Sequence, residues 1–301
     1  MKKISVIPIL VLLLANTVAS QDMEMFNKFF ADKTMRIDYY HIGDASDEFI
    51  TLDQIYKYGI WAGSRVHLID EMNLGRYCVK IYDAASGQVI YSKGFDSYFG
   101  EYKTGSEGIE GIEKTFQESA IIPYPNNKII FALERRDEQQ NLFEFYRTEI
   151  DPENMMIIRD EVKSKQVKVY NADSNGDPHN RVDVVILGEG YTQDEKSKFE
   201  KDLKYFTDVF FGMEPYKSNA SKFNIYGVFK PSEDSGIDEP PANLFQNSVL
   251  SCTFSSMGSE RYILTEDNKA VRDLAAHVPY DAIYIMVNHA RYGGGGIYNF
   301  F

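Results

Sequence analysis

The strongest constraint on the fold is a change of hydrophobic pattern partway along this 301-residue chain. Residues 34–150 hold short runs rich in Ile, Val, Tyr and Phe, separated by clusters of turn-forming residues. Residues beyond 181 instead alternate between strand-like and helix-like segments. A chain of this length is expected to form about two domains. The pattern therefore predicts an all-β domain followed by an α/β domain.

The first region predicts a β-sandwich, because its strands follow one another with no long helical period between them. Two hairpins are expected, one joining Tyr77–Tyr82 to Gln88–Tyr91 and one joining Lys128–Glu134 to Leu142–Ile150. The segment Gly105–Glu118 is charged and rich in glycine, which indicates a loop rather than a core strand.

Composition places the boundary between the two regions in a polar stretch. We assign the sandwich to residues 26–158, a linker to residues 159–180 and the α/β domain to residues 181–301. Within the linker, Asn171–Asp177 has the alternating Asx residues of a calcium loop. Val182 stands where such a loop needs its closing Glu, so we interpret the stretch as an Asx-rich turn.

The second region predicts a largely parallel sheet that is covered by helices, since strands and helices alternate along it. Thr192–Glu195 has the form of a capping box at the start of a helix. In chain order, the expected elements are strand Val182–Leu187, a helix from Thr192, strand Phe223–Phe229, helix Asp267–Ala276 and strand Asp281–Val287.

The first 20 residues predict export. Met1–Lys3 is basic, Ile4–Ala15 is apolar but too short to cross a bilayer core of about 30 Å, and Val18–Ser20 supplies small residues for cleavage. We therefore expect residues 1–20 to be a signal peptide and the mature chain to carry no transmembrane segment. The expected location is the periplasm, the cell surface or the extracellular space.

The net charge of the chain bears on whether it binds nucleic acid, and its two cysteines bear on whether it forms a disulfide. The chain has 45 Asp and Glu residues against 32 Lys and Arg residues, a net charge of -13, which argues against binding to nucleic acid. An exported protein can form disulfides, so a bond between Cys78 and Cys252 stays open, although we interpret both as buried free thiols.

Gly188 and Gly190 follow a predicted strand, where a dinucleotide-binding fold places its glycines. Gln193 stands where the third glycine belongs, and the charge of Glu189 would repel a pyrophosphate, so a nucleotide site is not predicted. The sequence also contains no Gly-x-Ser-x-Gly motif of the kind that marks many serine hydrolases.

The histidines do not form the pattern of a catalytic zinc site. None belongs to a His-Glu-x-x-His motif, which would place two zinc ligands one helical turn apart. We expect His277 to cap the end of its helix and His289 to lie in a loop after a buried strand. The five histidines are His41, His67, His179, His277 and His289.

A run of four glycines, Gly293–Gly296, lies near the C-terminal end of the sequence. It lacks the Lys-Ser or Lys-Thr of a phosphate-binding loop. Bare glycine backbone allows another chain to approach and pair with it, but a flexible surface turn is an equally open interpretation.

Several motifs together resemble the IgA-peptidase family of secreted zinc metallopeptidases. Those in the second region are Asp183–Thr192, Phe254–Tyr262 and Tyr292–Asn299. Those in the first region are similar to the β-sandwich domain that precedes the peptidase in that family, namely Arg36–His41, Tyr91–Phe95, Phe99–Tyr102 and Phe116–Ser119. The resemblance covers nearly all of the mature chain.

The resemblance implies a metzincin-like α/β peptidase domain in which an edge strand lies above a zinc-binding helix. In the family, zinc polarises the scissile carbonyl and activates water, and the glutamate of a His-Glu-x-x-His motif moves protons. That motif would follow the glycine-rich stretch, and this sequence does not contain it. We therefore expect a domain truncated before its active-site helix, an inactive fragment with no catalytic or metal-binding residue and no bound zinc.

By the same resemblance, the glycine-rich stretch lies beside the cleft and accepts a peptide by strand addition. The expected partners are protein or peptide substrates, including host or glycosylated proteins. The alternative is a non-catalytic exported module that binds a protein or glycan surface. The candidate substrate-binding residues are Gly293, Gly294, Gly295, Gly296, Ile297, Tyr298 and Asn299.

Overall fold

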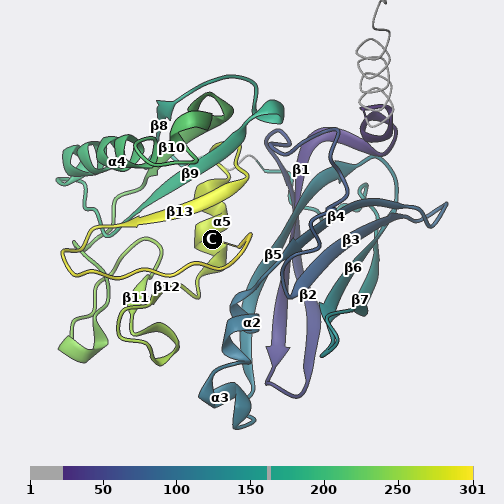
Figure 1. Cartoon of the computed structure of the whole chain (residues 1–301), viewed down its shortest axis with the longest axis horizontal. Coiled ribbons are helices and arrows are strands. Elements are labelled where there is room, and N and C mark those ends of the chain that lie inside the picture. The colour runs from purple at the N-terminus through teal and green to yellow at the C-terminus, as the bar shows by residue number, and fades with distance from the viewer. Residues whose placement is uncertain (1–22, 161–163, 301) are drawn as a thin grey trace, which may run out of the picture.

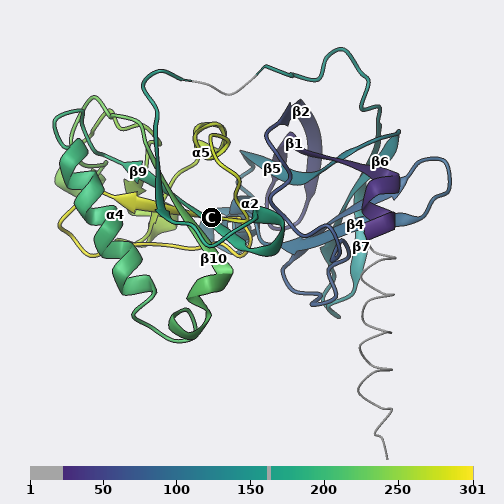
Figure 2. The same cartoon turned by 90° about the horizontal axis from the view of Figure 1, so that it is seen from above.

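A computed structural model describes residues 23–160 and 164–300, which form a β-rich part and an α/β part (Figure 1). Figure 2 shows the two parts side by side, with α5 of the second part facing β5 of the first. The predicted signal peptide lies outside the described residues. Within the described ranges, no helix is both long enough and apolar enough to span a membrane.

The first part consists of two antiparallel sheets. In the first sheet, β1 (Phe30–Gly43) lies between β2 (Glu48–Tyr58) and β5 (Lys114–Pro125). The second sheet has the order β4-β3-β6-β7, with β3 at Tyr77–Asp83, β4 at Val89–Phe95, β6 at Ile129–Arg136 and β7 at Leu142–Ile150. Both predicted hairpins are present, because β3 pairs with β4 and β6 pairs with β7.

The two sheets face each other across one apolar core, so the predicted sandwich is confirmed. Met35 and Ile37 of β1 are fully buried, as are Ile81 of β3 and Phe131 of β6. They belong to one cluster to which both sheets contribute. Alternation along each strand turns these side chains inward, and each contributes roughly 1.5 to 3 kcal/mol of burial free energy.

The predicted loop Gly105–Glu118 is wrong in both halves, because it contains a short helix and the start of a core strand. The described helix α3 (Ser106–Ile109) is followed by Lys114–Glu118 as the start of β5, and a short helix, α2 (Tyr98–Tyr102), precedes it. The charge of Glu118 misled the prediction, because this fully buried carboxylate accepts a hydrogen bond from the backbone N–H of Phe99 and contacts His41. These partners lie far away in sequence.

The second part is built on a sheet with the order β13-β9-β10-β8. The central strand β9 (Val182–Glu189) pairs in parallel with β10 (Phe223–Phe229) and with β13 (Ala282–Val287), as predicted. β8 (Lys168–Asp173) adds an antiparallel strand beside β10. This strand lies inside the segment that the sequence predicts to be a linker.

Helices cover both faces of this sheet. On one face, α4 (Lys196–Phe210) buries Phe199, Leu203 and Phe210 against β9 and β10. On the other face, α5 (Asn268–Ala275) packs Val271 and Leu274 beside Val185 and Ile283. Further short elements are the strands β11 (Thr253–Phe254) and β12 (Ile263–Leu264) and the 3-10 turns Pro178–Asn180, Lys217–Lys222, Pro240–Ala242 and Ser256–Gly258.

Candidate functional site

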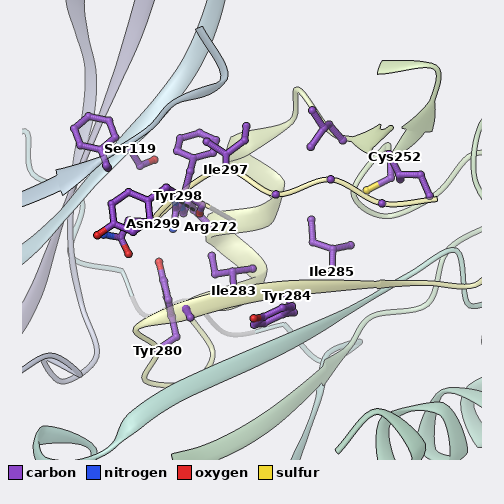
Figure 3. A pocket seen from close by; sticks show the side chains of 18 of the residues that line it. Ser119, Cys252, Arg272, Tyr280, Ile283, Tyr284, Ile285, Ile297, Tyr298 and Asn299 are labelled. Carbon is purple, nitrogen blue, oxygen red and sulfur yellow. Dashed lines mark hydrogen bonds between the residues drawn. The ribbon is translucent and has the colours of Figure 1, made fainter. Parts of the chain in front are cut away.

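A cavity of about 700 Å³ lies between the sandwich and the α/β part. We call it the interdomain cavity. β13 forms one side, the stretch Gly293–Asn299 forms another, and β3, β4 and β5 of the sandwich close one end. Figure 3 shows Ile283 and Ile285 pointing from β13 into this space, with Ile297 on the opposite side. All seven candidate substrate-binding residues therefore line one cavity.

β13 offers unpaired backbone to this cavity. Its apolar sequence suits a strand buried against α5 on one face and α4 on the other. In the described part of the chain, β9 is its only neighbour in the sheet. Alternate residues of a parallel edge strand direct their N–H and C=O groups away from the sheet, so β13 can pair with one more strand.

The four glycines differ in what surrounds them. A Cβ atom on Gly293 would come within 2.9 Å of the Arg261 carbonyl oxygen and would strike Phe254, whereas one on Gly295 would come within 2.8 Å of Leu264. A Cβ atom on Gly294 or Gly296 would meet nothing within 4 Å. Gly293 and Gly295 are therefore required for close packing against the β11–β12 hairpin, and Gly294 and Gly296 leave the other side open.

Side-chain contacts fix the start of this stretch. Arg291 pairs with Glu239 and lies over the ring of Phe254, 4.7 Å from its centroid. Its backbone N–H donates to His289 Nδ1 at 3.0 Å, and His289 Nε2 lies 3.6 Å from a carboxylate oxygen of Glu239. The Gly294 N–H then donates to the Arg261 carbonyl at 3.0 Å.

The other end is fixed to the sandwich. Ile297 and Phe300 are buried in an aromatic cluster with residues of α2 and β5. The backbone N–H of Asp96 donates to the Tyr298 carbonyl at 2.8 Å, and the Asn299 amide donates to the Gly94 carbonyl at 2.8 Å. The stretch is thus held at both ends, while its middle glycines, Gly294–Gly296, are exposed.

A chain of polar contacts fixes the two parts around the cavity. Arg36 of β1 donates to Asp273 of α5 at 2.8 Å and to Asp38 at 2.9 Å. Ser119 of β5 donates to Asp38 at 2.6 Å and accepts from the Asn268 amide at 2.9 Å. Burial alone would lower the pKa of Arg36, but the two carboxylates outweigh it and raise that pKa above its ordinary value.

The glycines of the predicted strand-to-helix turn have a packing role. A Cβ atom on Gly188 would lie 2.7 Å from the ring of Phe199, and Gly190 has a φ of +75° with the Gly236 backbone against it. Glu189 is fully buried and accepts from the backbone N–H groups of Leu250 and Cys252 at 2.9 Å each. Burial raises the pKa of Glu189, against the effect of these hydrogen bonds. Nothing in this arrangement favours a phosphate.

The family resemblance implies zinc, which needs three protein ligands grouped around an open fourth position. His41 is enclosed by Glu48 and Glu118, His179 contacts Asp32, and His277 bonds to the Leu274 carbonyl, as expected for a helix cap. In the described ranges, no three His, Cys, Asp or Glu side chains are grouped to hold a metal ion. These residues do not fit a catalytic zinc site.

Two smaller predictions concern the cysteines and the Asx-rich stretch, and two further residues line the cavity. Cys78 and Cys252 are both free and buried. The predicted Asx-rich turn Asn171–Asp177 is only partly correct, because Asn171 and Asp173 lie in β8. The turn follows that strand, and there Asn175 donates to Asp173 and to the Phe223 carbonyl. The sandwich supplies Trp61 and Lys93 to the cavity wall. No motif marks these two residues, because only the packing of the two parts brings them to the glycines.

Comparison with known families divides the chain in the same way as the fold. Residues 25–147 match the family described as Peptidase M64 N-terminus, and residues 170–301 match the family described as IgA Peptidase M64. A search of curated proteins finds no match. The first range covers most of the sandwich, and the second begins within β8 and includes the glycines. The two matches cover most of the sequence, and the chain belongs to the IgA peptidase M64 family of peptidases.

Proposed function

We propose that this chain is the substrate-binding part of an exported, zinc-dependent endopeptidase. In this proposal the α/β part is metzincin-like and lacks its active-site helix, and sequence outside the described residues supplies the zinc ligands and the general base. The chain alone is inactive. Its partners are protein or peptide substrates, including host or glycosylated proteins. The family assignment supports the reaction class, peptide-bond hydrolysis.

The single observation that carries the proposal is the position of Gly293–Asn299 beside the free edge of β13. Both segments offer backbone hydrogen-bonding groups, and both border the interdomain cavity. A peptide in extended form can pair with such an edge, and its backbone is then held in a defined orientation. Binding and orientation of the substrate are what the described residues can contribute.

The described residues do not fit zinc, so no step of hydrolysis is assigned to them. His41, His179, His277 and His289 each have a protein partner, and none lies in a group of three donors. We place the zinc-dependent chemistry outside these residues for this reason. Export is proposed from the sequence of residues 1–20 alone.

The test compares this chain with a longer version of the protein that carries a His-Glu-x-x-His motif. Metal analysis and a chelator-sensitive peptidase assay are run on both. We expect one equivalent of zinc and chelator-sensitive cleavage only in the longer version. Zinc-dependent cleavage by the 301-residue chain would contradict the proposal. Peptide binding without cleavage by either version would favour the alternative, a non-catalytic binding module.

A further inference from the structure

Lys93 of β4 lines the interdomain cavity at its sandwich end. The part of the chain that the structure describes gives its side-chain ammonium group neither a hydrogen bond nor an ion pair. Burial and the nearby charge of Arg272 lower the pKa of Lys93, and the charges of Asp281 and Asp70 offset this only in part. Lys93 is half-buried, and neither carboxylate makes a direct contact with its ammonium group, so the site favours a ligand that places an anion against that group.

The other charged groups on the cavity wall already have partners. Arg272 donates to the Phe300 carbonyl and to Asn268, and Arg291 pairs with Glu239. A carboxylate oxygen of Asp281 accepts the backbone N–H of Asp183 at 2.9 Å. The cavity lining thus carries three basic side chains against one acidic side chain, although the whole chain has a net charge of -13.

The rest of the lining suits apolar side chains. Trp61 and Phe95 of the sandwich are buried at the cavity, and Ile283 and Ile285 project into it from β13 (Figure 3). An extended peptide pairs its backbone with a strand edge and turns alternate side chains to the same side. The walls therefore match a peptide with alternating apolar residues and one negative charge at the sandwich end.

We propose that Lys93 is the anion-binding residue of a peptide site in the interdomain cavity, and that it selects extended peptides that present a carboxylate. The carboxylate belongs to an acidic side chain or to the C-terminus of the peptide. This inference rests on the proposed function in one respect, since both place a peptide along β13. It adds the chemical class of the preferred ligand and assigns its recognition to the sandwich.

Trp61 provides a direct readout, because it is the only tryptophan in the sequence and it lines the cavity. The chain is titrated with blocked synthetic peptides of about six residues, a length that matches a typical strand. One peptide carries a single Glu, and its partner carries Gln at the same position. A third peptide has the Gln sequence with a free C-terminal carboxylate. The change in Trp61 fluorescence gives the Kd for each.

We expect the Glu peptide to bind about tenfold more tightly than the Gln peptide, as one charge-assisted hydrogen bond in a partly enclosed site allows. In Lys93→Met, which keeps the apolar stem, this preference should disappear. Lys93→Arg should keep it, because the charge is retained. Lys128→Met is the matched control, since Lys128 is an exposed sandwich lysine paired with Glu149 and outside the cavity lining.

Equal Kd values for the Glu and Gln peptides would overturn the inference, and so would a preference that persists in Lys93→Met. Absence of binding by all three peptides would overturn it as well. If the peptide with the free C-terminus binds tightly, the site recognises a C-terminal carboxylate. If only the Glu peptide binds tightly, the site recognises an acidic side chain. Far-UV circular dichroism checks that each variant is folded.

These measurements need neither zinc nor cleavage, so the two proposals can fail separately. If Glu peptides bind through Lys93 but the longer version cleaves nothing, only the proposed function fails. If the longer version cleaves peptides with no preference for a carboxylate, only the role of Lys93 fails.

Discussion

The two edges of the α/β sheet differ in composition and in what borders them. β8 carries polar residues such as Lys168, Asn171 and Asp173, and Val169 on it is 46% exposed. β13 is almost entirely apolar, and it faces the interdomain cavity and the glycines beyond it. Exposed polar edges resist pairing with other chains, whereas an apolar edge held beside a cavity favours it. The comparison indicates that the β8 edge resists pairing with a further strand, whereas the β13 edge can accept one.

The largest expected effect is on stability when each edge is truncated to alanine. Ile283→Ala in β13 removes a buried side chain from the core under α5 and should lower the free energy of unfolding by about 2 to 5 kcal/mol. Val169→Ala in β8 should lower it by no more than about 0.5 kcal/mol, because the side chain is half exposed. Urea denaturation of the two variants checks this. Similar losses in the free energy of unfolding for the two variants would contradict the proposed difference between the β13 and β8 edges.

The second effect is the pH dependence of stability, and it arises from β9, the strand that pairs with β13. Burial raises the pKa of Asp183 to about 7, from an ordinary value of 3.8. A raised pKa in the folded state contributes stability that is fully present below pH 3.8 and is lost as the pH rises through about 7. Asp183 also holds the start of β13, because its carbonyl accepts the Asp281 N–H at 2.7 Å.

Replacement of Asp183 by Asn removes this titration. Relative to Asp183→Asn, the wild-type protein should lose up to about 4 kcal/mol of stability between pH 4 and pH 8. This upper limit converts the rise in the pKa of Asp183 at about 1.4 kcal/mol per pKa unit. Urea denaturation of both proteins at several pH values measures the difference. Parallel pH profiles would show that Asp183 is already ionised in the folded state at low pH.

Much of this architecture can be predicted from the sequence, because it depends on the local order of apolar and polar residues. Alternating apolar residues predicted the sandwich hairpins, and the strand and helix order predicted the parallel core of β9, β10 and β13. The β8 strand was missed because an exposed edge strand has the polar composition of a linker. The start of β5 was missed because the partner that stabilises Glu118 is His41, 77 residues away.

The candidate site could be predicted only in part, for the same physical reason. The glycines at 293–296 are visible in the sequence, and the packing of β11 and β12 explains two of them. Lys93 and Trp61 lie in a different domain from the glycines, and no local feature separates them from other sandwich residues. Their role depends on how the two parts pack through Arg36 and Asp273, which is a tertiary property.

The smallest effect separates Gly293 from Gly296, the first and last glycines of the run beside β13. Gly293→Ala should cost about 1 to 3 kcal/mol and weaken peptide binding, because Phe254, Ile263 and the Arg261 backbone leave no room for a methyl group. Gly296→Ala is its matched control and should change stability by no more than about 0.5 kcal/mol, since nothing lies within 4 Å. Thermal unfolding and the Trp61 titration measure both. If Gly296→Ala is the more harmful change, the open side has been assigned wrongly.

The most direct test of the central claim is hydrogen–deuterium exchange with and without the blocked Glu peptide at saturating concentration. The account predicts slower exchange at the backbone amides of β13 (Ala282–Val287) and of residues 293–299, and no change in β8 (Lys168–Asp173), which serves as the internal control. Protection in β8, or protection confined to the sandwich, would contradict the claim that the edge beside the glycines receives the peptide.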